Sequence, residues 1–149
     1  MRRRRALVGL GVALLGCHRA PARVESCRDN LGGVWRAEGD ARFRYRISDD
    51  GRQVTLWPLY AAGGPGTGYG SARTVLVRTA AGTLAGATET TYSESGKTCP
   101  LRFQARIDRC GGGKLELAGE TNFDIEIATC TVHSSGVLQV ATLVREGDR

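Results

Sequence analysis

The sequence predicts an all-β fold, a single antiparallel meander of eight or nine strands. Three observations predict it: apolar and polar residues alternate with period two along most of the chain from residue 31, glycine-containing signals separate these segments, and no segment has a convincing helical period. A meander of this size buries its apolar face best by closing into a small barrel, and a two-sheet β-sandwich is the alternative.

Each strand has its own pattern. A short apolar stretch surrounds Val34, and Phe43, Tyr45 and Ile47 then alternate with polar residues, so that one face of the strand is apolar and the other wet. The predicted strands lie near residue 34 and at residues 42–48, 54–60, 74–79, 83–92, 101–108, 114–121, 123–131 and 137–144.

Turn signals join consecutive strands as hairpins. Four of them contain glycine, which supplies the positive φ that tight hairpins require. They are Asp49-Asp50-Gly51, Ala81-Gly82, Gly111-Gly112-Gly113 and Ser134-Ser135-Gly136.

The N-terminus has the pattern of an export signal. Residues 1–5 carry a dense positive cluster, and residues 6–16 form an apolar run without a charge. A transmembrane helix needs about 20 apolar residues, so this run is too short to be a permanent span. We expect residues 1–16 to be a signal peptide.

Leu14-Leu15-Gly16-Cys17 at the end of this run resembles the bacterial lipobox, although Leu15 is larger than usual for its position. The resemblance implies cleavage before Cys17, a diacylglyceryl thioether on its thiol and acylation of the freed amine. Two or three acyl chains hold a protein firmly in a membrane. Residues 17–30 are then the lipidated N-terminus and tether, and residues 31–149 the β domain.

The residue after the lipobox cysteine indicates where the protein is sorted. In this family an aspartate there usually signals retention in the inner membrane, but this chain has His18. By resemblance we expect a lipid anchor in the outer membrane, facing the periplasm. Ala20-Pro21-Ala22 offers an alternative, ordinary cleavage that would release a secreted soluble protein.

Charge argues against nucleic acid as a partner. The chain of 149 residues has a net charge of +6, but four of its 21 basic residues are Arg2 to Arg5, which leaves 17 basic against 15 acidic residues. A nucleic-acid-binding surface needs concentrated basic residues to displace counterions from phosphates.

Four cysteines follow Cys17, and in an exported chain they predict two disulfides. If Cys99 and Cys110 end one strand, they lie about 36 Å apart, too far for a disulfide. The glycine turn and two further strands return Cys130 to the end at which Cys110 lies. We therefore expect Cys110 to pair with Cys130 and Cys27 with Cys99, although strand parity also brings Cys27 near that end.

Gly33-Val34-Trp35, preceded by Leu31, resembles the G-x-W signature of lipocalins and other calycins. In those families the tryptophan packs over one end of the barrel. The arginine that they carry late in the chain corresponds only loosely to Arg145. The same pattern is also typical of any buried tryptophan near a strand start, so the resemblance predicts an architecture and no ligand.

Nothing in the sequence indicates catalysis, a cofactor or a metal site. His133 is the only histidine of the β domain, has no nucleophile motif beside it and is expected at the surface. Asp49 and Asp50 are expected in a turn. The glycine-rich residues 63–70 lack the lysine and helix of a phosphate-binding loop and are interpreted as a flexible loop.

Arg42, Arg44 and Arg46 form a basic stripe on one strand face. The stripe is suited to anionic lipid headgroups. The alternative is a solvated face paired with acids of other strands, for which Glu116, Glu120, Asp124 and Glu126 are the candidates.

Two non-enzymatic functions remain open. In the first, the barrel binds a small apolar ligand inside or at its mouth. In the second, the domain is an envelope scaffold or an inhibitor that binds another envelope protein through a loop. A large apolar cavity would favour the first function, and a filled interior with a rigid protruding loop would favour the second.

Overall fold

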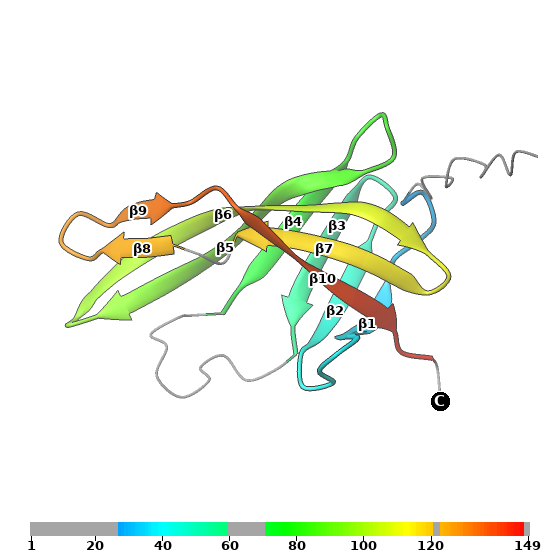
Figure 1. Cartoon of the computed structure of the whole chain (residues 1–149), viewed down its shortest axis with the longest axis horizontal. Helices are drawn as coiled ribbons and strands as arrows, with labels where there is room; N and C mark the ends of the chain where they lie inside the picture. The colour runs from blue at the N-terminus through cyan, green and yellow to red at the C-terminus, as the bar shows by residue number, and fades with distance from the viewer. Residues whose placement is uncertain (1–26, 60–70, 121–122, 148–149) are drawn as a thin grey trace, which may run out of the picture.

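The structure, a computed structural model, describes residues 27–59, 71–120 and 123–147, and every regular element in these ranges is a β-strand (Figure 1). No helix there is long and apolar enough to cross a membrane. The strands are β1 (Gly33–Ala37), β2 (Arg44–Asp49), β3 (Gln53–Pro58), β4 (Arg73–Arg78), β5 (Leu84–Glu94), β6 (Lys97–Gly111), β7 (Lys114–Glu120), β8 (Phe123–Glu126), β9 (Thr131–Ser134) and β10 (Leu138–Arg145).

Eight of these strands form a closed antiparallel barrel, so the predicted fold class is confirmed and the sandwich alternative is excluded. Neighbouring strands follow chain order from β1 to β7, and β10 then pairs with both β7 and β1. Closure is direct, because Trp35 of β1 lies opposite Arg145 of β10 and opposite Tyr45 of β2.

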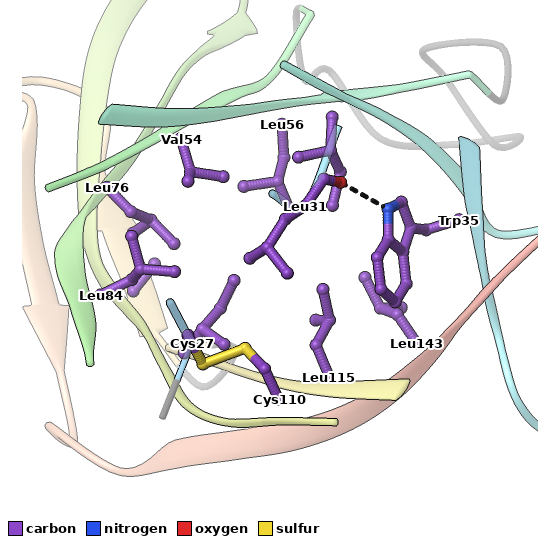
Figure 2. Packing of buried hydrophobic residues seen from close by; sticks show 13 residues of the cluster. Cys27, Leu31, Trp35, Val54, Leu56, Leu76, Leu84, Cys110, Leu115 and Leu143 are labelled. Carbon is purple, nitrogen blue, oxygen red and sulfur yellow. Dashed lines mark hydrogen bonds between the residues drawn. A yellow bond between two sulfur atoms is a disulfide. The ribbon is translucent and has the colours of Figure 1, made fainter. Parts of the chain in front are cut away.

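One end of the barrel is filled by a hydrophobic core (Figure 2). Leu31 and Trp35 lie there among apolar side chains from the surrounding strands, including Leu56, Leu115 and Leu143. Cys27 joins this core and donates its backbone N–H to the carbonyl oxygen of Gly82, in the β4–β5 turn, at 2.9 Å. We call this end, at which the β2–β3, β4–β5 and β6–β7 turns lie, the closed end; residues 27–30, grouped above with the tether, are part of it.

Trp35 occupies the position that the G-x-W resemblance implies. Its ring is 2% exposed at the closed end, and its Nε1 donates to the Leu31 carbonyl oxygen at 2.8 Å. Arg145, from the last strand, lies over the ring with its guanidinium carbon 4.9 Å from the ring centroid. The barrel is thus lipocalin-like at this end.

At the opposite end, β5 and β6 continue past the barrel as a long hairpin (Figure 1). Their pairing extends to Glu94 and Lys97, whereas β4 pairs with β5 only as far as Glu89 and β7 pairs with β6 only from Ala105. The β8–β9 hairpin is a separate two-stranded sheet that lies against this extension. We call the extension (residues 89–104) together with β8 and β9 the arm.

The prediction of one strand over residues 123–131 is wrong. The chain turns at residues 127–130 between β8 and β9, and Cys130 has a positive φ of 56°, which an extended strand does not contain. Apolar and polar residues alternate on both sides of this turn, but the alternation changes phase within it, from Ile125 and Ile127 to Cys130 and Val132.

The predicted disulfide pairing is also wrong. The structure links Cys27 to Cys110 and Cys99 to Cys130. Because β8 and β9 form a hairpin beside the arm, Cys130 lies near Cys99 and far along β6 from Cys110. The exclusion of a Cys99–Cys110 link is confirmed, since both cysteines lie on the single strand β6.

Candidate functional site

The arm has a hydrophobic core of its own, separate from that of the barrel. Cys99, Leu101 and Phe103 point to one side of β6 and are buried. Residues of the β8–β9 hairpin and its flanks cover them, and Phe123 stacks on Phe103 with ring centroids 4.2 Å apart. The covering residues of this hairpin and its flanks are Phe123, Ile125, Ile127, Cys130 and Val132, and Tyr92 of β5 packs against the same cluster.

Covalent and polar links hold the two hairpins of the arm together. The Cys99–Cys130 disulfide joins β6 to the end of the β8–β9 turn. The Lys97 ammonium donates to the Ala128 carbonyl oxygen in that turn. At the base of the arm, Glu120 of β7 bridges the two hairpins, because its carboxylate accepts from the Gln104 backbone N–H at 3.1 Å and from the Ser134 hydroxyl. These links make the arm a stapled unit, because they connect the tip, the middle and the base.

The face of the arm opposite its core is exposed and carries small polar side chains. Thr91, Ser93 and Thr98 are exposed there, and the Ser93 and Thr98 hydroxyl oxygens lie 2.8 Å apart across the two strands. Ser95 and Gly96, with φ of 51° and 79°, form the tip. Two successive positive φ values are typical of a tight two-residue hairpin turn. Such a turn fixes the position of β5 relative to β6 and therefore the orientation of this face.

Pro100 limits strand pairing at one edge of the arm. It lies on β6 beyond the part that pairs with β7, so this edge of the ribbon has no strand beside it. Proline has no backbone N–H and reduces the capacity of an edge to accept a further strand. The exposed side-chain face of the arm is therefore more accessible for contacts than this edge.

The mouth of the barrel contains a small cavity. Its volume is about 230 Å³, and Tyr45, Thr88 and Gln139 supply its polar lining. The rest of the lining is apolar and mostly small: Ala105, Leu117, Gly119, Val140 and Ala141. No aspartate, glutamate, lysine or arginine is among these residues, so the cavity offers no opposite charge to an ionic ligand.

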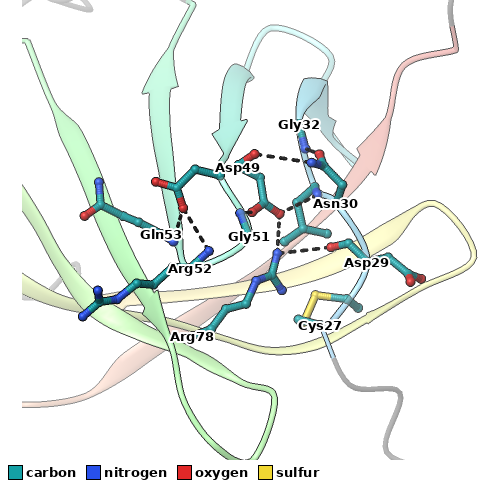
Figure 3. Close-up of polar contacts among 12 residues, drawn as sticks. Cys27, Asp29, Asn30, Gly32, Asp49, Gly51, Arg52, Gln53 and Arg78 are labelled. Carbon is teal, nitrogen blue, oxygen red and sulfur yellow. Dashed lines mark hydrogen bonds and ion pairs between the residues drawn. A yellow bond between two sulfur atoms is a disulfide. The ribbon is translucent and has the colours of Figure 1, made fainter.

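A polar network fastens residues 29–32 to the closed end (Figure 3). The Asp49 side chain is fully buried, forms an ion pair with Arg78 and accepts a hydrogen bond from the Leu31 backbone N–H at 2.8 Å. Arg78 also donates to the Asp29 carbonyl oxygen at 3.2 Å. The two hydrogen bonds join the N-terminal segment to strand ends and the ion pair joins the ends of β2 and β4, so this network has a structural role.

Asp49 and Asp50 both take part in the expected turn, and Asp49 has the network as a second role. Asp49 Oδ1 accepts a hydrogen bond from the Gly51 backbone N–H at 2.9 Å. The Asp50 carboxylate accepts hydrogen bonds from the backbone N–H groups of Gln53 at 2.6 Å and Arg52 at 2.9 Å. These bonds lower the pKa of Asp50. No local signal identifies Arg78 as the partner of Asp49, since the two residues are 29 positions apart.

The remaining candidates from the sequence do not converge on one site. His133 is exposed on β9, as expected, and within the described ranges no three histidine, cysteine or acidic side chains form a metal-binding group. Cys17 and the glycine-rich residues 63–70 lie outside the described residues.

The arginine stripe is largely neutralised, and only Arg44 and Arg46 of it lie on β2, because Arg42 precedes the strand. Arg42 forms an ion pair with Asp40, and Arg44 makes two hydrogen bonds to Glu146 at 2.6 and 2.9 Å. Pairing with acids is thus confirmed for these two arginines, but the acids differ from the expected ones. Arg46 has no acidic partner in the part of the chain that the structure describes.

Comparisons of the chain with protein-family models, with curated proteins and with solved structures find no match.

Proposed function

We propose that this protein is a lipid-anchored protein of the bacterial cell envelope that binds another envelope protein through its arm, without catalysing a reaction. Cys17 carries the anchor in this proposal, and the barrel is the rigid support. The outer membrane, facing the periplasm, is the compartment that His18 favours. The two disulfides support an oxidising, extracytoplasmic environment.

The observation that carries the proposal is the stapled arm. Barrel closure uses β5 and β6 only up to the points where β4 and β7 end, yet these strands continue to Glu94 and from Lys97. The extra length has its own core, its own disulfide and a covering hairpin. None of these features is needed to close the barrel, and rigid protruding elements lower the entropy cost of binding.

The exposed face of the arm is suited to a protein partner. Thr91, Ser93 and Thr98 offer hydroxyl groups that donate or accept, so they adapt to the backbone and side chains of another protein. The disulfide and the tight tip restrict the movement of the ribbon. The buried interior of the closed end also favours binding by a protruding element over binding deep inside the barrel.

Site-specific photo-crosslinking in the native host tests this proposal. A photoreactive residue replaces Thr91 on the arm, and for the control it replaces Arg52 in the β2–β3 turn of the closed end; both residues are exposed. We expect a discrete crosslinked adduct from position 91 that is absent from position 52. Identical adduct patterns from both positions would contradict the arm as the binding element.

The double variant Cys99→Ser/Cys130→Ser sharpens this test. It removes the staple and leaves the Cys27–Cys110 link of the barrel intact. We expect the position-91 adduct to weaken while the barrel stays folded. A crosslinked adduct of unchanged yield from this variant would show that the Cys99–Cys130 disulfide is not needed to position the binding face.

A second candidate function rests on the cavity at the mouth. At about 230 Å³ it is smaller than most ligand pockets, and its lining carries polar atoms but no ionic side chain. These properties favour a small uncharged ligand. Native mass spectrometry of the full chain is expected to show a retained small molecule, and Gly119→Leu is expected to displace it by filling the cavity. An unliganded wild-type spectrum would contradict this second function.

A further inference from the structure

The outer surface of β3, β4 and β5 combines a largely apolar, partly exposed strip with a basic rim. Val54, Leu56 and Leu76 point into the core, so the residues between them point outward. The outward strip, here the β3–β5 wall, consists of Thr55, Trp57, Val75, Val77, Ala85 and Ala87, and register places Val75 between Thr55 and Ala87 and places Ala85 beside Val77. Thr55 and Ala87 are themselves buried, at 8% and 7% exposure, so the exposed part of the wall lies on either side of them.

Two large apolar side chains of the β3–β5 wall are markedly exposed. Trp57 is 39% exposed and Val77 is 45% exposed, and Leu59, just beyond β3, is 41% exposed. A tryptophan with its ring at the surface is suited to an interface between an apolar and an aqueous phase, because its body is apolar and its N–H is polar.

Arginines flank the β3–β5 wall on both sides. Arg46 of β2 lies directly opposite Trp57, and Arg106 of β6 lies directly opposite Ala85. Arg73 and Arg102 share one acid, Glu89, at 3.0 and 3.6 Å, and Arg106 contacts Asp108 at 2.7 Å. The rim therefore has four arginines, counting Arg46, but only two acidic partners. Its net positive charge attracts an anionic surface.

The N-terminal segment joins the fold at the edge of this wall that lies at the closed end of the barrel. The Cys27 backbone N–H is bonded to the carbonyl oxygen of Gly82 in the β4–β5 turn, and Asp29 accepts from Arg78 at the end of β4 (Figure 3). Only ten residue steps separate Cys27 from Cys17. Fully extended they span about 35 Å, so a lipid on Cys17 keeps the wall within that distance of the bilayer.

From these observations we propose that the β3–β5 wall lies on the anionic phospholipid headgroups of the membrane that holds the anchor. Trp57 sits among the headgroups and the flanking arginines contact lipid phosphates. Because the anchor tethers the protein to the bilayer, the effective concentration of lipid headgroups near the wall is high. A weak contact is then enough to keep the wall on the membrane. This inference rests on the lipid anchor of the proposed function.

A second copy of the chain fits the same wall poorly. In a two-fold dimer the same patch faces itself, so the arginine rim of one copy would meet the arginine rim of the other. Like charges across an interface disfavour association. An anionic bilayer provides the complementary charge, and high salt is expected to weaken its contact with the wall.

Tryptophan fluorescence of the full lipidated chain in vesicles tests the proposal. The chain has two tryptophans, and Trp35 is only 2% exposed, so a surface quencher reports on Trp57. The vesicles contain phosphatidylcholine brominated in its acyl chains, either alone or mixed with phosphatidylglycerol. With phosphatidylglycerol we expect bromine quenching of the emission and protection from acrylamide in the water, and a marked loss of both effects without it. The Trp57→Phe variant assigns the signal.

Matched charge reversals identify the face. Arg46→Glu with Arg106→Glu is expected to abolish bromine quenching, whereas Arg36→Glu with Lys114→Glu, on β1 and β7, is expected to leave it unchanged. Thermal melts confirm that both proteins are folded. Equal quenching of the two double variants, or full acrylamide access to Trp57 on anionic vesicles, would overturn the proposal.

Flotation separates this proposal from the anchor. A protein that floats with neutral vesicles but shows no quenching on anionic ones retains its anchor and refutes the wall contact. A protein that fails to float with neutral vesicles refutes the anchor, and quenching on anionic vesicles then still decides whether the wall binds lipid.

Discussion

Arg145 and Trp35 connect the last strand of the barrel to the first. The guanidinium carbon lies 4.9 Å from the ring centroid, and Nη2 donates to the Asn30 carbonyl oxygen at 2.6 Å. One arginine thus holds the tryptophan that fills the closed end and the segment that precedes it. We expect this residue to stabilise the closure between β10 and β1.

Replacing Arg145 by alanine should lower the free energy of unfolding by about 1 to 2 kcal/mol, because a cation–π contact and a charged hydrogen bond are lost together. Urea denaturation measures this change. Arg36→Ala, on the neighbouring strand, is the control and should alter stability by about 0.5 kcal/mol or less. Equal effects of both substitutions would contradict a special role for Arg145.

Gly86 of β5 is predicted to be intolerant of a side chain. A Cβ at this position would lie 2.0 Å from the carbonyl oxygen of Val75 on β4, and backbone cannot move aside easily. Gly86→Ala should therefore destabilise the barrel by about 2 kcal/mol or more. Gly119→Ala is the matched control, since its Cβ would meet nothing within 4 Å. Thermal melts compare the two, and a neutral Gly86→Ala would show that β4 and β5 are further apart.

The two disulfides should act on different parts of the molecule. The Cys27–Cys110 link spans 83 residues and the Cys99–Cys130 link spans 31, which in the chain-entropy description correspond to about 4.5 and about 3.5 kcal/mol. Cys27→Ser/Cys110→Ser should lower the melting temperature of the barrel. Cys99→Ser/Cys130→Ser should raise hydrogen exchange mainly in the arm. Non-reducing peptide mapping checks the links, and a Cys110–Cys130 peptide would refute the pairing.

Cys17→Ser should abolish lipidation and release the protein from membranes. The thiol is the acceptor of the diacylglyceryl group in the lipobox resemblance, so serine removes the attachment point. Palmitate labelling and fractionation of cells measure both effects. Undiminished label in the variant would remove the anchor, and a mature N-terminus at Arg23 would indicate cleavage after Ala22 instead.

Asp40 should titrate at unusually low pH. The hydrogen bonds from the Arg42 side chain, and then from its backbone N–H, lower the pKa of Asp40 from 3.8 to about 2. Because the folded-state pKa is the lower one, the stabilisation exists above pH 3.8 and disappears as the pH falls towards 2. An NMR titration should show this value in the wild type and a return towards 3.8 in Arg42→Ala. An unchanged pKa in the variant would contradict the contact.

Local patterns predicted the elements that the barrel is made of. The alternation of Phe43, Tyr45 and Ile47 identified β2, and Asp50-Gly51 identified the turn after it, because side-chain direction and turn geometry depend on residues close together in the chain. Trp35 was placed at a barrel end by a three-residue pattern. In each case the structure is determined by contacts between residues that are close together in the sequence.

The arm could not be predicted in this way. Ile125 and Ile127 alternate at odd positions and Cys130 and Val132 at even ones, but such a change of phase does not by itself distinguish a bulge in one strand from a reversal of the chain. The reversal at Cys130 depends on burial against Leu101 and Phe103, which lie more than twenty residues earlier. Once the hairpin forms, the partner of Cys130 changes from Cys110 to Cys99, which is why the pairing inferred from strand parity was wrong.

The sequence by itself therefore determined that the chain is all-β, where most strands begin and end, and that four cysteines are available for two disulfides. Only the tertiary structure decided which cysteines pair, that Asp49 is buried against Arg78, and that Trp57 and Arg46 share an outer wall. The physical reason is the range of the interactions. Alternation and turns follow from neighbouring residues, whereas these pairings arise only when barrel closure brings distant strands into register.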